Sequence, residues 1–451
     1  MLFDKLSSDY HPPLYFVILK IWIEIFGASI ISLKIFQGVN LVMLLYSSII
    51  IIRYRVDDRK YIYSIVFALS MPILLYGVML RYYAMAASIA VFSTYYLLRF
   101  LNSENKKYVV YVAVMYALLL YTDYPSAMIM IAHVIIVLIR ARRHIIIYSY
   151  TIVGAITLFA PWGNILFGQL KQITEAGSTA HFNESAYSIL IKYAYSFYSY
   201  LIGETILPTE AIDLTIAATA ITALVAVYMY NRSWKRAIRE WPLLLVAITG
   251  LMMTSIITTY ISTHTSFVYT PSRSLYVYPH LFVVLISPIT GSSRKYLPGV
   301  VLWIIMLTYG WYNYINDRHF FMPVYATPWG DISKQIVDSG CPVVSDESHV
   351  LRYYEKHNGL SIDILETADA IIRNEPHGVA QKKPCVNIIL TDRMSTESEL
   401  NQRELDRLLG AYKNVDTTTF LTYPENYLKL IQRYTKKEHY KGKVIVIEAG
   451  P

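Results

Sequence analysis

The sequence predicts an all-α polytopic membrane bundle of about ten spanning helices, followed by a small C-terminal extracytoplasmic α/β domain. The chain has 451 residues, and 55% of them are apolar. Apolar runs of about 18–22 residues recur, and each is long enough to cross a hydrocarbon core of roughly 30 Å. After Asn316 polar residues become common. We therefore expect a transmembrane domain over residues 1–318 and an extracytoplasmic domain over residues 319–451.

The first apolar segment, 14–27, is short and carries Lys20 and Glu24, so we expect it to lie on the membrane surface. Spanning helices are then predicted over residues 31–52, 61–79, 83–99, 107–122, 124–140, 144–162, 211–231, 241–262, 274–291 and 296–316. The long segment 163–210 is rich in Tyr, which favours the membrane interface. It is expected to form an interfacial helix that either lies flat or contacts lipid or an acceptor.

Positive charge predicts the orientation of the chain. The net charge is +8, and Lys and Arg gather in alternate loops, near residues 53–60, 99–107, 140–143, 232–239 and 294–295. The positive-inside rule makes these loops cytoplasmic. The N-terminal segment, residues 163–210 and everything after 316 then lie outside a multi-pass protein of the cell membrane. Because membrane topology accounts for the excess of cations, we expect no nucleic-acid partner.

The C-terminal region alternates between strand and helix patterns. Strands are predicted over 342–345, 385–390 and 443–447, with helices near 347–357 and 365–373. This alternation is typical of an α/β domain with a partly parallel sheet. Cys341 and Cys385 each begin one of the strands, so they are either bridged in an oxidising compartment or remain two free buried thiols. Two cysteines without a histidine pair at ligand spacing predict no zinc site.

Four polar motifs fall on the predicted outer face. They are Asp9-Tyr10-His11-Pro12-Pro13, Arg81-Tyr82-Tyr83, Thr122-Asp123-Tyr124-Pro125, and Pro271-Ser272-Arg273 with His264 upstream. Arginine pairs with phosphate through its planar fork, and Asp and His serve as bases or metal ligands. Two guanidiniums, an imidazole and carboxylates on one face therefore predict a site for an anionic substrate.

Each motif residue also has a structural explanation. Asp9 is well placed to cap the helix that follows the proline pair, and His11 alone is compatible with a structural role. Arg81 could reach a lipid headgroup, Asp123 could be an ordinary turn residue before a proline, and Arg273 could anchor a membrane boundary. His133, in the middle of a predicted span, is expected to be hydrogen-bonded within the bundle.

The motifs, in this order, resemble the protein O-mannosyltransferase-like family of C-type membrane glycosyltransferases. Asp9-Tyr10-His11-Pro12-Pro13-Leu14 is similar to the family's D-x-H-P-P-L segment. Further similar segments are Arg81-Tyr82-Tyr83-Ala84, Leu120-Tyr121-Thr122-Asp123-Tyr124 and Pro271-Ser272-Arg273-Ser274-Leu275 through Pro279. The resemblance covers roughly residues 9–316.

The resemblance implies transfer of a sugar from a polyprenyl- or dolichyl-phosphate donor, with inversion, to a protein, lipid or glycan acceptor outside the membrane. Asp9 and His11 are the candidate catalytic residues. Arg81, Tyr82 and Arg273 are the candidate ligands of the donor phosphate. Asp123 and His264 are candidate ligands of the acceptor or of a divalent metal, the one cofactor that we consider.

Two departures from the family pattern qualify this function. The family usually has a further N-terminal span and an acidic pair upstream of the first motif, so we expect the principal base to lie outside these 451 residues. The family also commonly has His where this chain has Asp123. Two alternatives therefore stay open: an inactive or partner subunit of such an enzyme, and a transporter of lipid-linked saccharides.

Overall fold

A computed structural model of the chain describes residues 11–56, 60–176, 186–206, 211–230, 239–264, 271–287, 297–316, 329–345, 348–365, 385–391, 413–422 and 443–450. The chain divides into two compact units, one of Met1–Gly203 and Thr215–Trp311, the other of Glu204–Leu214 and Tyr312–Pro451. The longer part of the second unit starts at Tyr312, six residues before the boundary expected at 318. The unit also includes the short earlier segment Glu204–Leu214. Asn313 holds that segment by donating to the Thr205 carbonyl at 2.7 Å.

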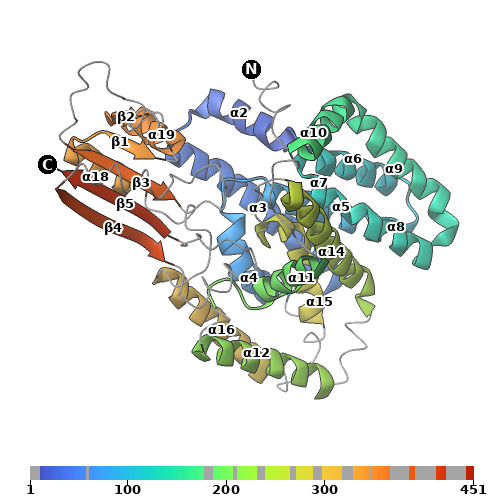
Figure 1. Cartoon of the computed structure of the whole chain (residues 1–451). Helices are drawn as coiled ribbons and strands as arrows, with labels where there is room; N and C mark the ends of the chain where they lie inside the picture. Colours follow the sequence, from blue (N-terminus) through green and yellow to red (C-terminus); the bar gives the residue numbers. More distant parts are fainter. Residues whose placement is uncertain are drawn as a thin grey trace. The chain divides into compact units, whose positions relative to one another are not determined.

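The first unit is a bundle of helices (Figure 1). Its regular α-helices are α2 (Leu14–Phe26), α3 (Ile30–Arg55), α4 (Lys60–Ala68), α5 (Tyr83–Ser103), α6 (Lys107–Thr122), α7 (Tyr124–Ala127), α8 (Ile129–Arg140), α9 (Ile145–Phe159), α10 (Gly163–Ala176), α11 (Ala186–Leu201), α14 (Trp241–His264) and α15 (Tyr278–Ile286). Helices α12 (Ala211–Tyr230) and α16 (Leu297–Ile315) each contribute to both units.

Several of these helices are apolar enough to cross a membrane. Among the described residues, four segments have the length and composition for this: Ile30–Arg55, Tyr83–Ser103, Arg142–Lys171 and Trp241–Tyr260. Two shorter apolar helical segments are Lys107–Thr122 and Tyr124–Arg140. A helical membrane bundle is therefore confirmed, whereas the total of ten spans stays a prediction.

Helix α5 is the central element of the first unit. It contacts α3, α6, α8 and α15, and 72% of its apolar window is buried, against 28% for Arg142–Lys171. The side chains it buries include four alanines, at positions 84, 86, 87 and 90. Small side chains allow neighbouring helices to approach closely. The N-terminal end of α5, which carries the Arg81-Tyr82-Tyr83 motif, is consequently held between several helices.

Two predicted spans are interrupted, and both corrections involve proline. Residues 61–79 do not form one helix, because α4 ends at Ala68 and a π-helix, η1, covers Ile73–Gly77 after Pro72. Residues 274–291 are not one helix either: a 3-10 segment, η4 (Pro271–Val277), precedes α15. A proline removes a backbone donor and clashes with the preceding turn, so the hydrogen-bond ladder changes at these points.

Two further differences concern helix boundaries. The predicted span 124–140 bends at Met128, between α7 and α8. The predicted span 144–162 runs on beyond its expected end, because a 3-10 turn joins α9 to α10 within the apolar segment Arg142–Lys171. The Tyr-rich part of the predicted outer loop is helical, as expected, and forms α11.

Helix α2 matches the short amphipathic segment expected at 14–27. Ile21, Ile25 and Phe26 are exposed in the isolated chain, and Lys20 forms an i,i+4 pair with Glu24 at 3.0 Å. Trp22 donates to the Ser32 hydroxyl at 3.0 Å, which fixes the turn between α2 and α3. An exposed apolar face beside a charged pair is typical of a helix at a membrane interface.

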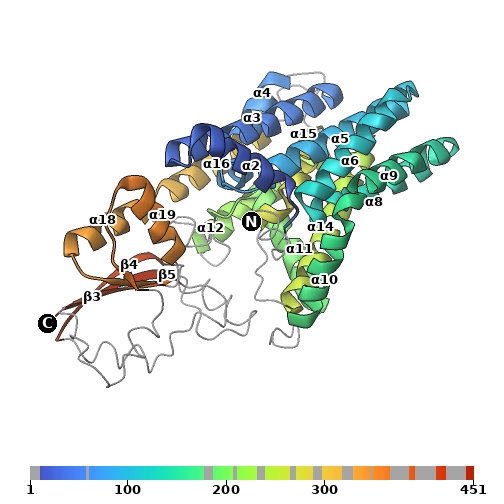
Figure 2. The same cartoon turned by 90° about the horizontal axis from the view of Figure 1, so that it is seen from above.

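The second unit contains a five-stranded sheet of order β2-β1-β3-β5-β4. Its strands are β1 (Val343–Ser345), β2 (Ile364–Leu365), β3 (Val386–Thr391), β4 (Asn414–Thr422) and β5 (Lys443–Gly450). The pairs β1–β2 and β1–β3 are parallel, and β3–β5 and β4–β5 are antiparallel, so the sheet is partly parallel. Figure 2 shows α18 (Trp329–Ser339) and α19 (Ser348–Asn358) on one face of it.

One core joins those helices to the sheet. It contains Ile332, Ile336 and Leu351 from the helices and Val343, Ile389 and Val446 from the strands. The helix expected near 365–373 is corrected at its start, because Leu365 belongs to β2; residues 366–373 lie outside the described residues. Strand β4 was not predicted, since its Thr417-Thr418-Thr419 run lacks an apolar alternation.

Cys341 and Cys385 form a disulfide. The sequence had left open whether these cysteines are bridged or remain free thiols. The cysteines precede the parallel neighbours β1 and β3, and their Cα atoms lie 5.5 Å apart. The bond closes a loop with a sequence separation of 44. It restricts the unfolded chain and fixes the two strand starts beside each other.

Replacing both cysteines with serine is expected to destabilise the second unit by about 4 kcal/mol, from the loop-closure entropy of a loop of this length. Pulse proteolysis of the full-length protein in urea, read at sites within 329–450, measures this. Intact-mass analysis after alkylation, with and without reductant, provides the control. Alkylation of both thiols in the unreduced protein would contradict the disulfide.

Gly250 of α14 lies in close contact with η4. A Cβ at this position would lie 2.7 Å from the Val277 Cγ2 and 3.2 Å from the Tyr276 ring. Gly250→Ala is therefore expected to displace η4 and lower the melting temperature by several degrees, since overpacking costs about 1–3 kcal/mol. Gly168→Ala, where a Cβ meets no atom within 4 Å, is the control; equal melting temperatures for the two variants would contradict the close contact.

Candidate functional site

Tyr82 lies where the polar motifs meet. It is the N-cap residue of α5 and is 3% exposed. The His11 ring packs 5.6 Å from the Tyr82 ring, and the Tyr15 ring lies 6.5 Å from it, measured between centroids. The start of α2 is thereby placed against the start of α5, although the two are far apart in the sequence.

Three charged residues act on the Tyr82 hydroxyl. The Arg273 Nη1 donates to it at 3.5 Å. Burial raises the pKa of Tyr82, the Asp123 charge raises it further, and Arg273 and Arg81 oppose this rise. We call these five residues, His11, Arg81, Tyr82, Asp123 and Arg273, the Tyr82 cluster. It unites side chains from all four polar motifs.

Asp123 ends α6 and begins α7. Its side chain caps α7 by accepting from the Ser126 backbone N–H at 2.9 Å, so the predicted turn role is confirmed. The side chain is also 3% exposed. Burial raises the pKa of Asp123 to about 6, while the Ser126 hydrogen bonds and the Arg273 charge pull it downward. A carboxylate with such a pKa can gain and lose a proton near neutral pH.

Arg81 lies in the turn between η1 and α5, as expected. Its N–H donates to the Met79 carbonyl at 2.7 Å, which forms a tight turn. The residue is half-buried. Burial raises the pKa of Tyr15, and the Arg81 charge opposes that rise, so Arg81 acts on two tyrosines at the junction of α2 and α5. The π-helix directly before this turn is of a kind often found at functional sites.

Arg273 is carried by η4, which several tyrosines hold in place. The Tyr200 hydroxyl donates to the Pro271 carbonyl at 2.6 Å. The Tyr276 hydroxyl donates to the Gly250 carbonyl at 2.9 Å and contacts the Pro125 carbonyl at 3.2 Å. Because Pro125 follows Asp123 closely, Tyr276 joins the Arg273 segment to the Asp123 turn.

The remaining sequence-predicted residues are placed only in part. Asp9 lies outside the described residues. His264 ends α14, but its side chain is not among those described. Within the described part of the chain, no three His, Cys, Asp or Glu side chains gather as metal ligands. The expectation that Asp9 belongs to one site with Arg81 and Arg273 stays a prediction.

Sequence reasoning did not identify Tyr15, Tyr200 and Tyr276 as parts of the site. The chain has 41 tyrosines, so residue type alone gives little indication of which ones matter. Their position relative to the motifs could have indicated two of them. Tyr276 lies within the family-like segment from Pro271 through Pro279, and Tyr15 directly follows the segment from Asp9 through Leu14.

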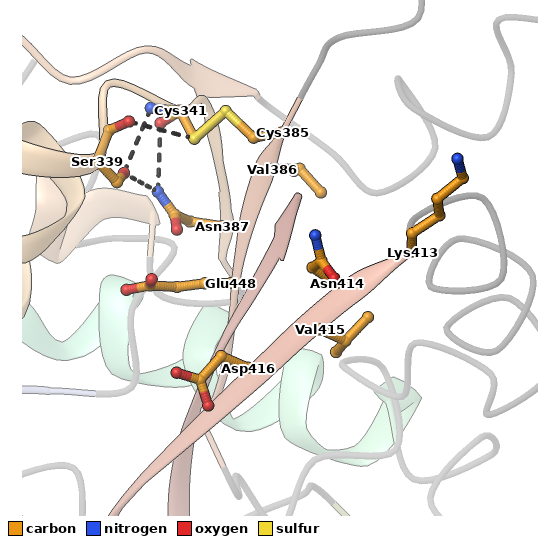
Figure 3. Close-up of a pocket in the computed structure, with 10 residues that line it drawn as sticks. All are labelled: Ser339, Cys341, Cys385, Val386, Asn387, Lys413, Asn414, Val415, Asp416 and Glu448. Atoms are coloured by element: carbon orange, nitrogen blue, oxygen red, sulfur yellow. Dashed lines mark hydrogen bonds between the residues drawn. A yellow bond between two sulfur atoms is a disulfide. The ribbon is translucent and has the colours of Figure 1, made fainter. Parts of the chain in front are cut away.

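The second unit has an open pocket of about 660 Å³ at one end of its sheet (Figure 3). The Cys341–Cys385 disulfide lies at its border. Asp416 and Glu448 face it from directly paired positions of β4 and β5. Asn387, also in the pocket, donates to the Ser339 hydroxyl at 2.7 Å. Apart from the two cysteines, this pocket contains none of the residues that the motifs singled out.

Part of the sequence is similar to a known family, and the fold is similar to that of a solved structure. Residues 10–164 match the family described as dolichyl-phosphate-mannose-protein mannosyltransferase. The fold is similar to the crystal structure of ArnT from Cupriavidus metallidurans in the apo state, with a TM-score of 0.52 and 11% sequence identity, over 98% of this chain and 89% of that chain. The sequence has no significant match among curated proteins.

The family match begins at Tyr10, so it includes the second and third polar motifs and all of the first except Asp9. The shared fold extends over nearly the whole chain, including the region of the fourth motif. The family match over residues 10–164 confirms the resemblance that the motifs predicted, and the structural match shows that the fold is shared.

Proposed function

We propose that the protein transfers a sugar from a polyprenyl- or dolichyl-phosphate donor to an acceptor hydroxyl on the outer face of the membrane, with inversion at the anomeric carbon. The observation that carries this proposal is the meeting of two guanidiniums, an imidazole and a buried carboxylate around Tyr82. The family name of the matched segment supports a lipid-linked donor.

Arg81 and Arg273 are the proposed ligands of the donor phosphate. Both lie close enough to Tyr82 to oppose the rise in its pKa, so their charges converge on one region. Guanidiniums bind phosphate through charge-assisted hydrogen bonds, and such bonds strengthen where water is scarce. The Tyr82 hydroxyl, which already accepts from Arg273, can donate to a phosphate oxygen in the same place.

The transfer itself is a single displacement. The bond between the anomeric carbon and the phosphate oxygen breaks, and polyprenyl phosphate leaves with the electron pair. The acceptor oxygen forms the new bond from the opposite face, which inverts the anomeric centre. Arg81 and Arg273 stabilise the negative charge that develops on the leaving phosphate. Pre-positioned charges of this kind need little rearrangement during the reaction.

The acceptor proton requires a base. Asp123 is the buried carboxylate of the cluster, and its pKa of about 6 suits proton transfer near neutral pH. His11, half-buried beside Tyr82, is the second candidate, and Asp9 is the third on sequence grounds alone. Asp123 and His264 are the proposed ligands of a divalent metal. No step of the proposed reaction depends on such a metal.

A transporter of lipid-linked saccharides would need similar phosphate contacts. The products separate the two functions, because a transferase releases free polyprenyl phosphate and a transporter does not. An inactive partner subunit would bind the donor and release nothing alone.

Replacing Arg81 or Arg273 with alanine is expected to lower transfer by about 100-fold, the usual effect of removing one contact to a charge that develops in the transition state. Purified protein in nanodiscs and a panel of radiolabelled polyprenyl-phosphate sugars provide the assay. Arg81→Lys and Arg273→Lys keep the charge and should retain more activity than the alanine variants.

Arg140→Ala is the matched control, because Arg140 is an exposed arginine at the other end of the bundle helices. Its activity should equal that of the wild type. Unchanged transfer by both Arg81→Ala and Arg273→Ala would refute the assigned phosphate site.

Activity is expected to rise with pH through about 6, as the Asp123 carboxyl loses its proton. Asp123→Asn should remove this limb together with most of the activity. Stability should change in the opposite direction: burial raises the pKa from 3.8 to about 6, so the folded protein retains a proton that the unfolded chain releases. The free energy of unfolding therefore falls as pH rises through this window.

Initial rates between pH 4.5 and 8, and thermal unfolding at the same values, measure both effects in the wild type and in Asp123→Asn. A rate that is flat across pH 5–7 in the wild type would exclude Asp123 as the base.

A further inference from the structure

A chain of hydrogen bonds crosses the buried interior of the first unit. The Tyr148 hydroxyl contacts the Tyr116 hydroxyl at 2.6 Å, and Tyr116 contacts the His133 Nδ1 at 2.7 Å. The His133 Nε2 lies 3.0 Å from the Thr94 hydroxyl, and that hydroxyl lies 2.8 Å from the His280 Nε2. These five side chains come from α9, α6, α8, α5 and α15, and each is at most 1% exposed.

The far end of the chain fixes its direction. The His280 Nδ1 lies 3.0 Å from the Tyr276 carbonyl oxygen. A carbonyl only accepts, so this nitrogen carries the hydrogen. In a neutral ring the Nε2 must then accept, and Thr94 is its donor. The further contact from Thr94 to the Ala90 carbonyl, at 3.1 Å, shares the same hydroxyl hydrogen.

The same reasoning continues to the other end. Since the Thr94 hydrogen points toward His280, the His133 Nε2 must donate to Thr94. The His133 Nδ1 then accepts from Tyr116, and Tyr116 accepts from Tyr148. This is the arrangement that keeps both rings neutral and sets no acceptor against an acceptor. Buried imidazolium ions would be costly in this interior.

The chain ends at the segment that carries a proposed phosphate ligand. Tyr276 follows Arg273 by three positions within η4. Its carbonyl accepts from His280, while its hydroxyl bonds to Gly250 and contacts the Asp123 turn. Thr254 also contacts that hydroxyl, at 2.8 Å. η4 is therefore connected through His280 to four other helices of the bundle.

We propose that His133 and His280 are positioning residues: both neutral, with hydrogen on Nε2 of His133 and on Nδ1 of His280, they hold η4 so that Arg273 can bind a phosphate group. The positioning role rests on the proposed function, whereas the tautomers do not. The bonds of this chain share one direction. Reversing any of them requires the others to reverse as well, and the His280 Nδ1 lone pair would then face the Tyr276 carbonyl oxygen.

The first experiment reads the tautomers directly. Protein labelled with ¹⁵N-histidine in nanodiscs is compared by NMR with His133→Gln and His280→Asn, which identify the two rings among the 11 histidines. Protonated and unprotonated ring nitrogens have well-separated shifts. We expect two neutral rings, with hydrogen on Nε2 of His133 and on Nδ1 of His280. An imidazolium at either position, or hydrogen on the other nitrogen of either ring, overturns the assignment.

The second experiment measures binding of a short-chain polyprenyl phosphate by calorimetry in nanodiscs. His133→Leu and Thr94→Val each break the chain, so each should raise the Kd by about tenfold, which corresponds to about 1.4 kcal/mol. His133→Gln keeps one donor and one acceptor and should stay within about twofold of the wild type. Tyr148→Phe removes only the terminal donor and should behave like His133→Gln.

A purely structural role would change other quantities. It would lower the melting temperature in His133→Leu and Thr94→Val and leave the Kd of the folded protein unchanged, and that result overturns the proposal. Thr94→Val is nearly isosteric and keeps the test valid if His133→Leu fails to fold. If the wild type binds no polyprenyl phosphate, the proposed function fails and the positioning role fails with it, while the tautomers are still decided by NMR.

Discussion

Burial of Asp123 and the Tyr82 hydroxyl among charged residues is the constraint on which the site depends. A carboxylate removed from water is costly unless opposite charge and hydrogen bonds compensate it. Here the Ser126 N–H and the Arg273 guanidinium supply part of that compensation, and the pKa is still raised to about 6. In the proposed function, the guanidiniums of this cluster bind the donor phosphate and the Asp123 carboxylate takes the acceptor proton.

The interruptions in the helices bring these groups together. The Arg81 turn follows a π-helix, Asp123 separates α6 from α7, and Arg273 lies in a 3-10 segment. Each break exposes polar backbone groups that a continuous helix would satisfy internally. Tyrosine hydroxyls bond to some of these groups, as Tyr200 does at the Pro271 carbonyl and Tyr276 at the Pro125 carbonyl. Irregular backbone is thereby tolerated beside an apolar bundle.

The hydrogen-bond chain through His133 and His280 has a different role from the cluster itself. Its five side chains are almost fully buried. They connect helices that are far apart in the sequence, from α5 to α15. A single central donor, the Thr94 hydroxyl, links the two rings. Partially satisfied polar networks destabilise an apolar interior, whereas fully satisfied ones specify one arrangement of it. His133 is bonded within the bundle, as its position in a predicted span suggested.

Much of the architecture was determined by the sequence alone, because apolar run length and strand alternation are local properties. They predicted α6 to the residue, the start of α5 to the residue and the start of α3 to within one, and the strands around Val343, Ile388 and Ile445. The polar motifs, read in order, also predicted the similarity to the mannosyltransferase family that residues 10–164 show. The breaks near Pro72 and Pro279 were less visible, since the surrounding residues remain apolar and hydropathy averages across them.

Only the tertiary structure decided which polar groups meet. Tyr82 and Arg273 are 191 positions apart, and Thr94 and His280 are 186 apart. Such pairings depend on how helices pack, and no local pattern encodes them. The same holds for the bond between Cys341 and Cys385, which required β1 and β3 to be neighbours. The sequence contained the chemical groups and their helices; the packing of α5 against its neighbours selected their partners.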